Sequence, residues 1–252
     1  MIGVMERAGT VQLASLSATE KLRATLTAIS QAFGGVDLGQ RIAAARREIG
    51  GRIVFTTSFG IEDQAIADAI FTQDLEIDVV TLDTGRLFPE MYDLWAATER
   101  RYGRRVRALY PDRQELEALV ARQGVNGFRI SLEARHACCA ARKVKPLGRA
   151  LTDAAGWMTG LRADQSCDRA SVSCASIEHR YRLIKVNPLF DWTRAQIVAY
   201  VRERAIPHSP LHDRGFLSIG CAPCTRAEQD GNKECGLHAD HPALARQTEP
   251  AR

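Results

Sequence analysis

The feature that most constrains the fold is a repeated unit: an apolar strand, then a polar turn, then an amphipathic helix. The first unit has a buried-strand pattern at 53–55, the turn Thr56-Thr57-Ser58-Phe59-Gly60, and a helix that begins near Ile61. The pattern recurs as strands at 77–82 and 106–110, followed by helices at 89–102 and 112–123. Strands joined through helices run parallel, with right-handed crossovers. We therefore predict an α/β fold with a parallel twisted sheet flanked by helices, and ligands bound beyond the carboxyl ends of the strands.

The rest of the chain extends this architecture. The spacing of apolar residues predicts further helices at 12–33, 37–49, 129–150 and 193–204, and further strands at 156–161 and 181–186. No Pro/Gly/Ser-rich linker divides the 252 residues. We expect a single α/β domain over residues 1–225 and a C-terminal tail over 226–252.

Composition narrows the function classes. No run approaches the roughly 18 apolar residues of a membrane-spanning helix, and Glu6 and Arg7 interrupt the first apolar stretch, so we expect a soluble, cytoplasmic protein. Net charge is +4 and the basic residues are scattered, which argues against a nucleic-acid partner. Of 34 basic residues, 29 are Arg, which suits bidentate binding of phosphate or sulfate; a codon-composition bias explains the excess at least as well.

Three polar turns follow predicted strands and should meet at one edge of the sheet. A turn that opens a helix offers main-chain N–H groups to a phosphate, and arginines can clamp an anion. Each turn also has an ordinary explanation, namely a serine cap, a tight Asp-Gly turn, or arginines in a solvated loop. The candidate nucleotide-binding residues are Ser58, Phe59, Gly60, Asp83, Gly85, Arg86, Gly160, Arg162 and Arg169.

Two pairs of cysteines give the strongest signal. Cys138-Cys139 lies on a predicted helix, and Cys221-Ala222-Pro223-Cys224 begins 82 residues after Cys139. Four thiolates in two groups are the ligand set of an iron-sulfur cluster or a structural zinc ion, and a Cys-X-X-Cys can also be a redox disulfide. Adjacent residues on a helix point about 100° apart. That divergence suits two different corners of a 4Fe-4S cluster better than one tetrahedral zinc ion. Cys167 and Cys174 lie between the two pairs without the spacing of metal ligands, and we interpret them as ordinary thiols.

Cys235 lies in the tail segment Lys233-Glu234-Cys235-Gly236-Leu237-His238. A cysteine beside Lys and His and followed by Gly can be a thiolate of lowered pKa that attacks a substrate and meets a second protein. A tail thiol without a role is the alternative.

Six segments in this order, SFGIED, LDTGRLFPE, CCAARKVKPL, TGLRADQS, GCAPCTR and KECGLH, resemble the bacterial assimilatory adenylylsulfate (APS) reductases of the phosphoadenylylsulfate reductase family. The likeness runs from about residue 40 to 238. It implies a modified PP-loop fold, resembling the adenine nucleotide α-hydrolases, with the nucleotide bound by the three turns. The 3'-phosphoadenylylsulfate (PAPS) reductases look similar but typically lack both cysteine pairs, so the resemblance favours APS.

The resemblance also implies roles for individual residues. One 4Fe-4S cluster would be held by Cys138, Cys139, Cys221 and Cys224. The Cys235 thiolate would attack the sulfur of APS, expel AMP and be discharged by thioredoxin, releasing sulfite for cysteine biosynthesis. Lys143 would join the charge of the leaving phosphate to the cluster, and His238 would orient the tail or bind substrate.

Two other function classes stay open: one shares the expected fold, and the other follows from a departure from the family pattern. Only residues 225–234 separate the second cysteine pair from the tail motif, with Arg226 as the one arginine and no tryptophan, where family members usually carry a longer segment. If the shortened segment weakens the chemistry, the chain is a metal-stabilised nucleotide-binding module. A PP-loop ATP pyrophosphatase that thiolates tRNA would share the expected fold. The turn Ser58-Phe59-Gly60 lacks the Ser-Gly-Gly pattern of that enzyme class.

Overall fold

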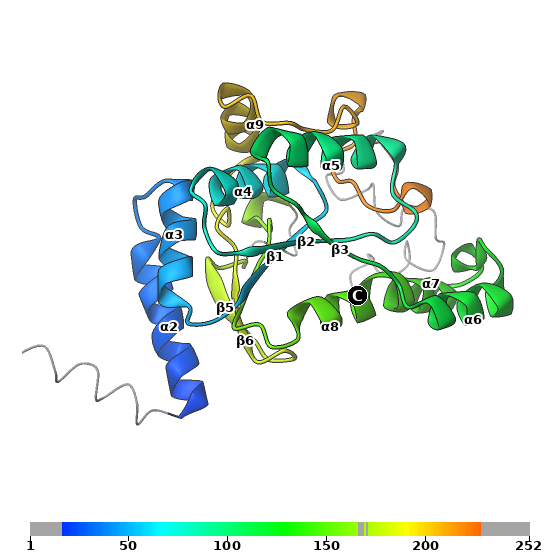
Figure 1. Cartoon of the computed structure of the whole chain (residues 1–252), viewed down its shortest axis with the longest axis horizontal. Coiled ribbons are helices and arrows are strands. Elements are labelled where there is room, and N and C mark those ends of the chain that lie inside the picture. Colours follow the sequence, from blue (N-terminus) through cyan, green and yellow to red (C-terminus); the bar gives the residue numbers. More distant parts are fainter. Residues whose placement is uncertain (1–16, 166–168, 170, 228–252) are drawn as a thin grey trace, which may run out of the picture.

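The computed structural model describes residues 17–165, 169 and 171–227. Helices cover both faces of a central sheet (Figure 1). The strands are β1 (Ile53–Thr57), β2 (Asp78–Leu82), β3 (Arg107–Leu109), β4 (Gly156–Met158), β5 (Ala175–Glu178) and β6 (Leu183–Val186). The helices are α2 (Ala18–Ala32), α3 (Leu38–Glu48), α4 (Ile61–Thr72), α5 (Pro89–Tyr102), α6 (Arg113–Gln123), α7 (Leu132–Cys139), α8 (Lys145–Leu151) and α9 (Arg194–Glu203).

The sheet has the strand order β3-β2-β1-β4-β6-β5. The central strand β1 pairs in parallel with β2 and β4, so that Phe55 lies opposite both Val79 and Met158. The predicted parallel sheet is confirmed for five strands. The sixth, β5, was not predicted, and it pairs with β6 in antiparallel fashion. Only residues 179–182 join these two strands, and so short a connection can only reverse the chain.

Alternation along the strands divides the core into two layers. Phe55 and Met158 face the larger layer, where they pack among buried residues that include Ile66 of α4 and Ile197 of α9. Val54 and Val80 face the smaller layer, which α8 helps to cover. Side chains of a strand point to opposite faces in turn, so a central strand covered on both sides must be apolar at nearly every position.

The single helix predicted over 129–150 is wrong, because the structure divides this segment into three parts. It begins as α7, passes through the π-helical turn Ala140–Val144, and continues as α8. The main-chain N–H of Lys145 donates to the carbonyl of Ala140, five residues back. A π turn adds one residue to a helix, and such turns are frequent at functional sites. The π turn of this chain follows directly after Cys138 and Cys139.

Smaller corrections concern element ends. β4 stops at Met158, short of the predicted end at residue 161, because the chain beyond Thr159 turns away to form the site. β6 likewise begins at Leu183 instead of residue 181. Among the described residues, no helix is both long and apolar enough to cross a membrane.

Candidate functional site

The turn after β1 is held in one conformation by its own side chains. The main-chain N–H and the hydroxyl of Ser58 both donate to Oδ2 of Asp63, at 2.6 and 3.0 Å. Phe59 has a positive φ of 58° and is 1% exposed, and its ring stacks on Trp95 at 5.6 Å. Gly60 is the N-cap of α4 and has no capping side chain. This helix start leaves its N-cap position without a side-chain cap, which is the place where the sequence predicts a bound phosphate.

Gly160 packs directly against this turn. A Cβ at this position would lie 2.5 Å from Oδ1 of Asp63 and 3.1 Å from Cβ of Glu62, so only glycine fits without displacing the carboxylate. Burial raises the pKa of Asp63 to about 7, while the hydrogen bonds from Ser58 act in the opposite direction. The first and third polar turns are thus brought together around a buried carboxyl group.

Arg162 is buried and committed to protein partners. Its Nε and Nη2 donate to Oε1 of Glu62 at 3.0 and 2.8 Å, and its Nη1 donates to Asp164 at 3.1 Å and to the Trp192 carbonyl at 3.3 Å. Only 4% of the side chain is exposed. An incoming anion would compete with two carboxylates for this guanidinium. Its geometry is that of a brace between the turn after β4 and the first turn of α4.

The turn after β2 brings the second predicted group to the same edge. Asp83 is 6% exposed, and its Oδ1 accepts from the main-chain N–H of Gly85 at 2.8 Å and from the hydroxyl of Tyr92 at 2.9 Å. Burial and the neighbouring Asp83 carboxylate raise the pKa of Tyr92 to about 12. Gly85 has a φ of +68°, a left-handed conformation that glycine adopts without strain.

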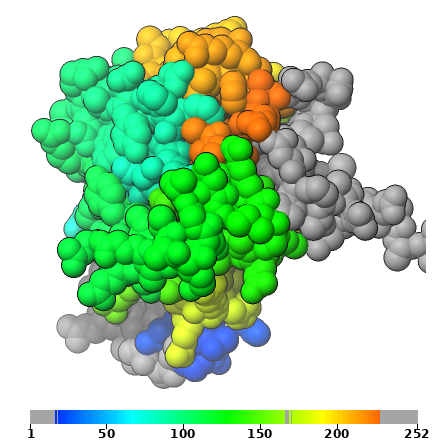
Figure 2. All heavy atoms as spheres, turned by 90° about the vertical axis from the view of Figure 1, so that its right-hand side faces the viewer, coloured from blue at the N-terminus to red at the C-terminus, as the bar shows by residue number. Residues whose placement is uncertain are grey.

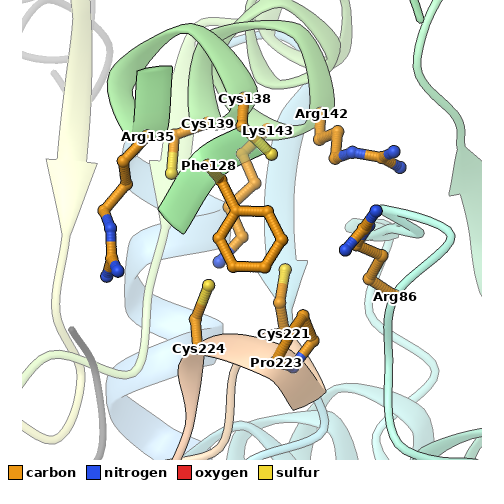
Figure 3. Close-up of a pocket in the computed structure, with 10 residues that line it drawn as sticks. All are labelled: Arg86, Phe128, Arg135, Cys138, Cys139, Arg142, Lys143, Cys221, Pro223 and Cys224. Carbon is orange, nitrogen blue, oxygen red and sulfur yellow. The ribbon is translucent and has the colours of Figure 1, made fainter. Parts of the chain in front are cut away.

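Both pairs of cysteines line one pocket beside this turn. Cys138 and Cys139 point into it from the end of α7, and Cys221 and Cys224 point toward them from the 3-10 turn Ala222–Cys224 (Figure 3). Figure 2 shows the orange end of the described chain lying against the green segment that carries α6 to α8. The pocket is lined by Arg86, Phe128, Arg135, Cys138, Cys139, Arg142, Lys143, Cys221, Pro223 and Cys224.

The charges around the pocket suit bound thiolates. Burial raises the pKa of the Cys139 thiol and of the Cys224 thiol, and each neighbouring thiol raises them further. Lys143 and Arg135 act against this shift, because their positive charges stabilise the thiolate form. Cys221 is buried and the other three cysteines are partly buried, and metal binding requires their thiols in the deprotonated form that these cations favour.

The four cysteines are the residues of this pocket whose chemistry suits a metal group. Among the described residues, no group of three or more His, Cys, Asp or Glu side chains is arranged to hold a metal ion. Four thiolates in two pairs are a ligand set of iron-sulfur clusters and of structural zinc, so the donor set fits either group.

The remaining predicted residues lie apart from this pocket or outside the described chain. Arg169 is half-buried and donates to Oε1 of Gln165 at 2.5 Å. The Cys174 thiol donates to the hydroxyl of Ser30 at 3.5 Å, away from the other cysteines. Cys235, His238 and Cys167 lie outside the described residues.

The family model for the phosphoadenosine phosphosulfate reductase domain matches residues 52–227, which span the sheet, the three turns and both cysteine pairs. The chain belongs to this family. Its relatives include a protein of Agrobacterium fabrum called adenosine 5'-phosphosulfate reductase, 48% identical over 241 residues, which cover 90% of this chain and 91% of the relative. A relative with the same name from Allochromatium vinosum is 41% identical over 217 residues, 77% of this chain and 85% of the relative.

Solved structures support the fold. The chain resembles the phosphoadenylyl-sulfate (PAPS) reductase of Candida auris, solved as a phosphate complex, with a TM-score of 0.69, 25% identity, and coverage of 84% of this chain and 98% of that one. The FMN adenylyltransferase of Candida glabrata, with FAD and pyrophosphate, has a TM-score of 0.51 at 14% identity, over 84% of this chain and 77% of that one. The second likeness concerns the fold alone.

Sequence reasoning missed several residues of the site. Phe128, Arg135 and Pro223 line the cysteine pocket, and Arg142 does so from a position to which the sequence gave no role. The sequence motifs could have indicated two of these residues, because Arg142 lies within the CCAARKVKPL segment and Pro223 lies within the Cys-X-X-Cys segment. Phe128 has no such signal, since it reaches the pocket from the loop between α6 and α7.

Proposed function

We propose that this chain is an adenylylsulfate reductase that converts APS to sulfite and AMP in assimilatory sulfate reduction. One observation supports the proposal: the turn at 83–86, which follows β2 at the sheet edge where α4 also starts, is bonded to the pocket lined by four cysteines through Thr84 and contributes Arg86 to it. A nucleotide site and a thiol-metal site therefore share one structural element. Family membership and the names of the relatives support the same activity.

The four cysteines of the pocket would hold one 4Fe-4S cluster. Bound there, the cluster would supply fixed charge close to the leaving phosphate, without changing its own oxidation state. Lys143 lines the cysteine pocket, and in this proposal its charge would also act on the phosphosulfate. Neutralising the developing charge on AMP makes it a better leaving group.

The nucleotide would bind across the three turns at the carboxyl edge of the sheet. Ser58, Phe59 and Gly60 would receive phosphate at the start of α4, and Asp83 and Gly85 would contact the nucleoside. Arg86 and Gly160 would shape the cleft, while Arg162 would brace it. Arg169 remains a proposed anion ligand beyond the turn.

The reaction requires a nucleophile that accepts the sulfonate group. We assign this role to Cys235, in the proposed tail 226–252 that follows the domain 1–225. Its thiolate attacks the sulfur of APS, a sulfur–sulfur bond forms, the bond to the phosphate oxygen breaks, and AMP leaves with both electrons of that bond. His238 would orient the tail or the substrate.

Thioredoxin is the proposed reductant of the S-sulfonated cysteine. One thiolate of its reduced dithiol attacks the Cys235 sulfur and releases sulfite, forming a mixed disulfide. The second thiol of thioredoxin then frees the Cys235 thiolate, so the two electrons come from the dithiol. We place the reaction in the cytoplasm, where thiols stay reduced.

The assignment of Cys235 is tested by trapping the intermediate. Incubation with APS in the absence of thioredoxin should add one sulfonate to the protein, mapped by peptide mass spectrometry to Cys235, and thioredoxin should then release it as sulfite. Cys235→Ser should keep the visible absorbance of the cluster but form no adduct. Cys174→Ser is the matched control and should form the adduct. An adduct on Cys167, or full turnover by Cys235→Ser, would show that the nucleophile is another residue.

Substrate choice provides an independent test. The four-cysteine pocket and the relatives' names lead us to expect much higher kcat/KM for APS than for PAPS. Steady-state kinetics with both nucleotides measure the ratio. Equal values would place the chain with the PAPS reductases, while release of pyrophosphate from ATP would refute the reductase assignment.

A further inference from the structure

We propose that Arg142 couples the nucleotide-binding turn to the cysteine pocket, acting as a positioning residue between the two. The turn in question is Asp83–Arg86, after β2. The inference rests on the proposed function, because it assumes a nucleotide at this turn and a cluster at the cysteines.

Arg142 is a buried cation that bonds to a main-chain carbonyl instead of a carboxylate. It is 7% exposed, and its Nη1 donates to the main-chain carbonyl of Thr84 at 2.5 Å. Its Nε has no hydrogen-bond partner, and among the described residues no carboxylate pairs with it. Burying a guanidinium costs free energy unless its charge and donors are used. The Thr84 carbonyl engages one of the two terminal nitrogens of this guanidinium, and Arg142 also lines the cysteine pocket.

The turn is bonded to the second cysteine pair as well. The hydroxyl of Thr84 lies 3.3 Å from Sγ of Cys221, and the main-chain N–H of Ala222 donates to the Arg86 carbonyl at 2.8 Å. The turn is therefore bonded to both cysteine segments, through Arg142 on one side and through residues 221–222 on the other. Figure 3 shows Arg142 and Arg86 on the same side of the pocket.

Arg142 lies in the π turn Ala140–Val144, and both Arg142 and its neighbour Lys143 line the pocket. The charge of Lys143 acts on the Cys139 and Cys224 thiols. Of the two cations, Arg142 makes the bond to the nucleotide-binding turn. Charge near the cysteines and attachment to the turn are thus divided between two adjacent residues, which allows a substitution to separate them.

This arrangement predicts that a nucleotide bound at the turn stabilises the cluster. Ordering the turn would strengthen the Arg142 bond and hold the helix that carries Cys138 and Cys139. Coupled sites in proteins commonly alter one another by about five-fold or more. We therefore expect saturating AMP to slow the loss of iron from the holoenzyme by at least about five-fold.

The experiment measures the rate at which iron passes from the iron-loaded protein to a chelator, with and without AMP. AMP binding is measured separately by calorimetry. Arg142→Lys keeps the positive charge but places Nζ about one bond, or roughly 1.3 Å, short of Nη1. That puts the Thr84 carbonyl beyond the roughly 3.2 Å of an N–H···O bond. We expect the variant to hold iron and to bind AMP, with protection by AMP falling toward one-fold.

Lys145→Gln is the matched control, since it removes a cationic side chain that pairs with Glu115 outside the pocket and keeps the Arg142 bond; AMP protection should persist in it. Arg142→Gln, which loses both charge and bond, should lose protection; if it does not fold, Arg142→Lys carries the test alone. Full protection in Arg142→Lys, or no protection in the wild type, would overturn the inference. Absence of iron or of AMP binding in the wild type would instead overturn the proposed function.

Discussion

Asp63 is a residue of the candidate site whose surroundings strongly change the pKa of its side chain. Its carboxyl group lies beneath the Ser58 turn and against Gly160, away from water, which raises its pKa from 3.8 to about 7. The folded state therefore holds the proton more tightly than the unfolded chain does. The stability that this group contributes is fully present below about pH 3.8 and is lost as the pH rises to about 7.

This sign gives a measurable pH dependence. A shift of about three pKa units corresponds to a change of the order of 4 kcal/mol in the free energy of unfolding. Asp63→Asn keeps an oxygen that accepts from Ser58 but cannot titrate, so the wild type should lose stability relative to this variant between about pH 4 and pH 7. Urea denaturation across this range measures the difference. Asp74→Asn, at an 80% exposed side chain, is the control for removing one carboxylate. Parallel curves for wild type and Asp63→Asn would contradict the prediction.

At the scale of elements, the π turn Ala140–Val144 decides where the cysteine helix and α8 point relative to each other. α8 is fixed by buried Pro146, Ala150 and Leu151, which pack toward the sheet. The extra residue of the π turn lets the cysteines of α7 face the pocket while α8 keeps its own buried face. A regular helix of the same sequence would rotate one part by about 100° relative to the other.

Deletion of Ala140 tests this role. If the deletion restores a regular helix, the cysteines turn away from Cys221 and Cys224, and most of the bound iron should be lost. Iron and acid-labile sulfide analysis of the purified protein measures the effect. Val144→Ala, in the same turn at a 36% exposed position, keeps the length and should retain iron. A deletion variant with a full complement of iron would show that the turn has no such role.

At the scale of the whole molecule, the cysteine pocket joins segments that are far apart in the sequence. Cys138 and Cys139 come before β4, and Cys221 and Cys224 come after α9, at the end of the described chain. A metal cluster bound by all four would link these segments as a crosslink does, and its binding free energy would add to the stability of the fold.

Replacement of any one of the four cysteines by serine should therefore remove iron and activity together. The melting temperature should also fall, by roughly 5–10 °C if cluster binding contributes about 2.7 kcal/mol in a chain of this size. Metal analysis, sulfite assay and calorimetry measure the three effects. Cys174→Ser, at a cysteine bonded to Ser30 outside the pocket, should change none of them. A fully active, iron-free variant would contradict the proposed cofactor.

The sequence by itself determined the strand–helix alternation, the parallel sheet and the three polar turns at its edge, because these follow from local periodicity and from the handedness of crossovers. It also identified four cysteines that the structure brings to one pocket, because the spacing of cysteines within each pair can be read directly from the sequence. The strand β5 escaped it, because a four-residue strand at a sheet edge has too little periodicity to detect.

Tertiary structure decided the partners of the charged groups. Arg162 could be read from sequence as an anion ligand, but only packing brings Glu62 and Asp164 to its guanidinium. Likewise, only packing places the Thr84 carbonyl against Arg142, 58 residues away in the chain. Such contacts depend on which long-range neighbours share a buried volume. Local sequence does not encode that, whereas helix and strand periodicity does.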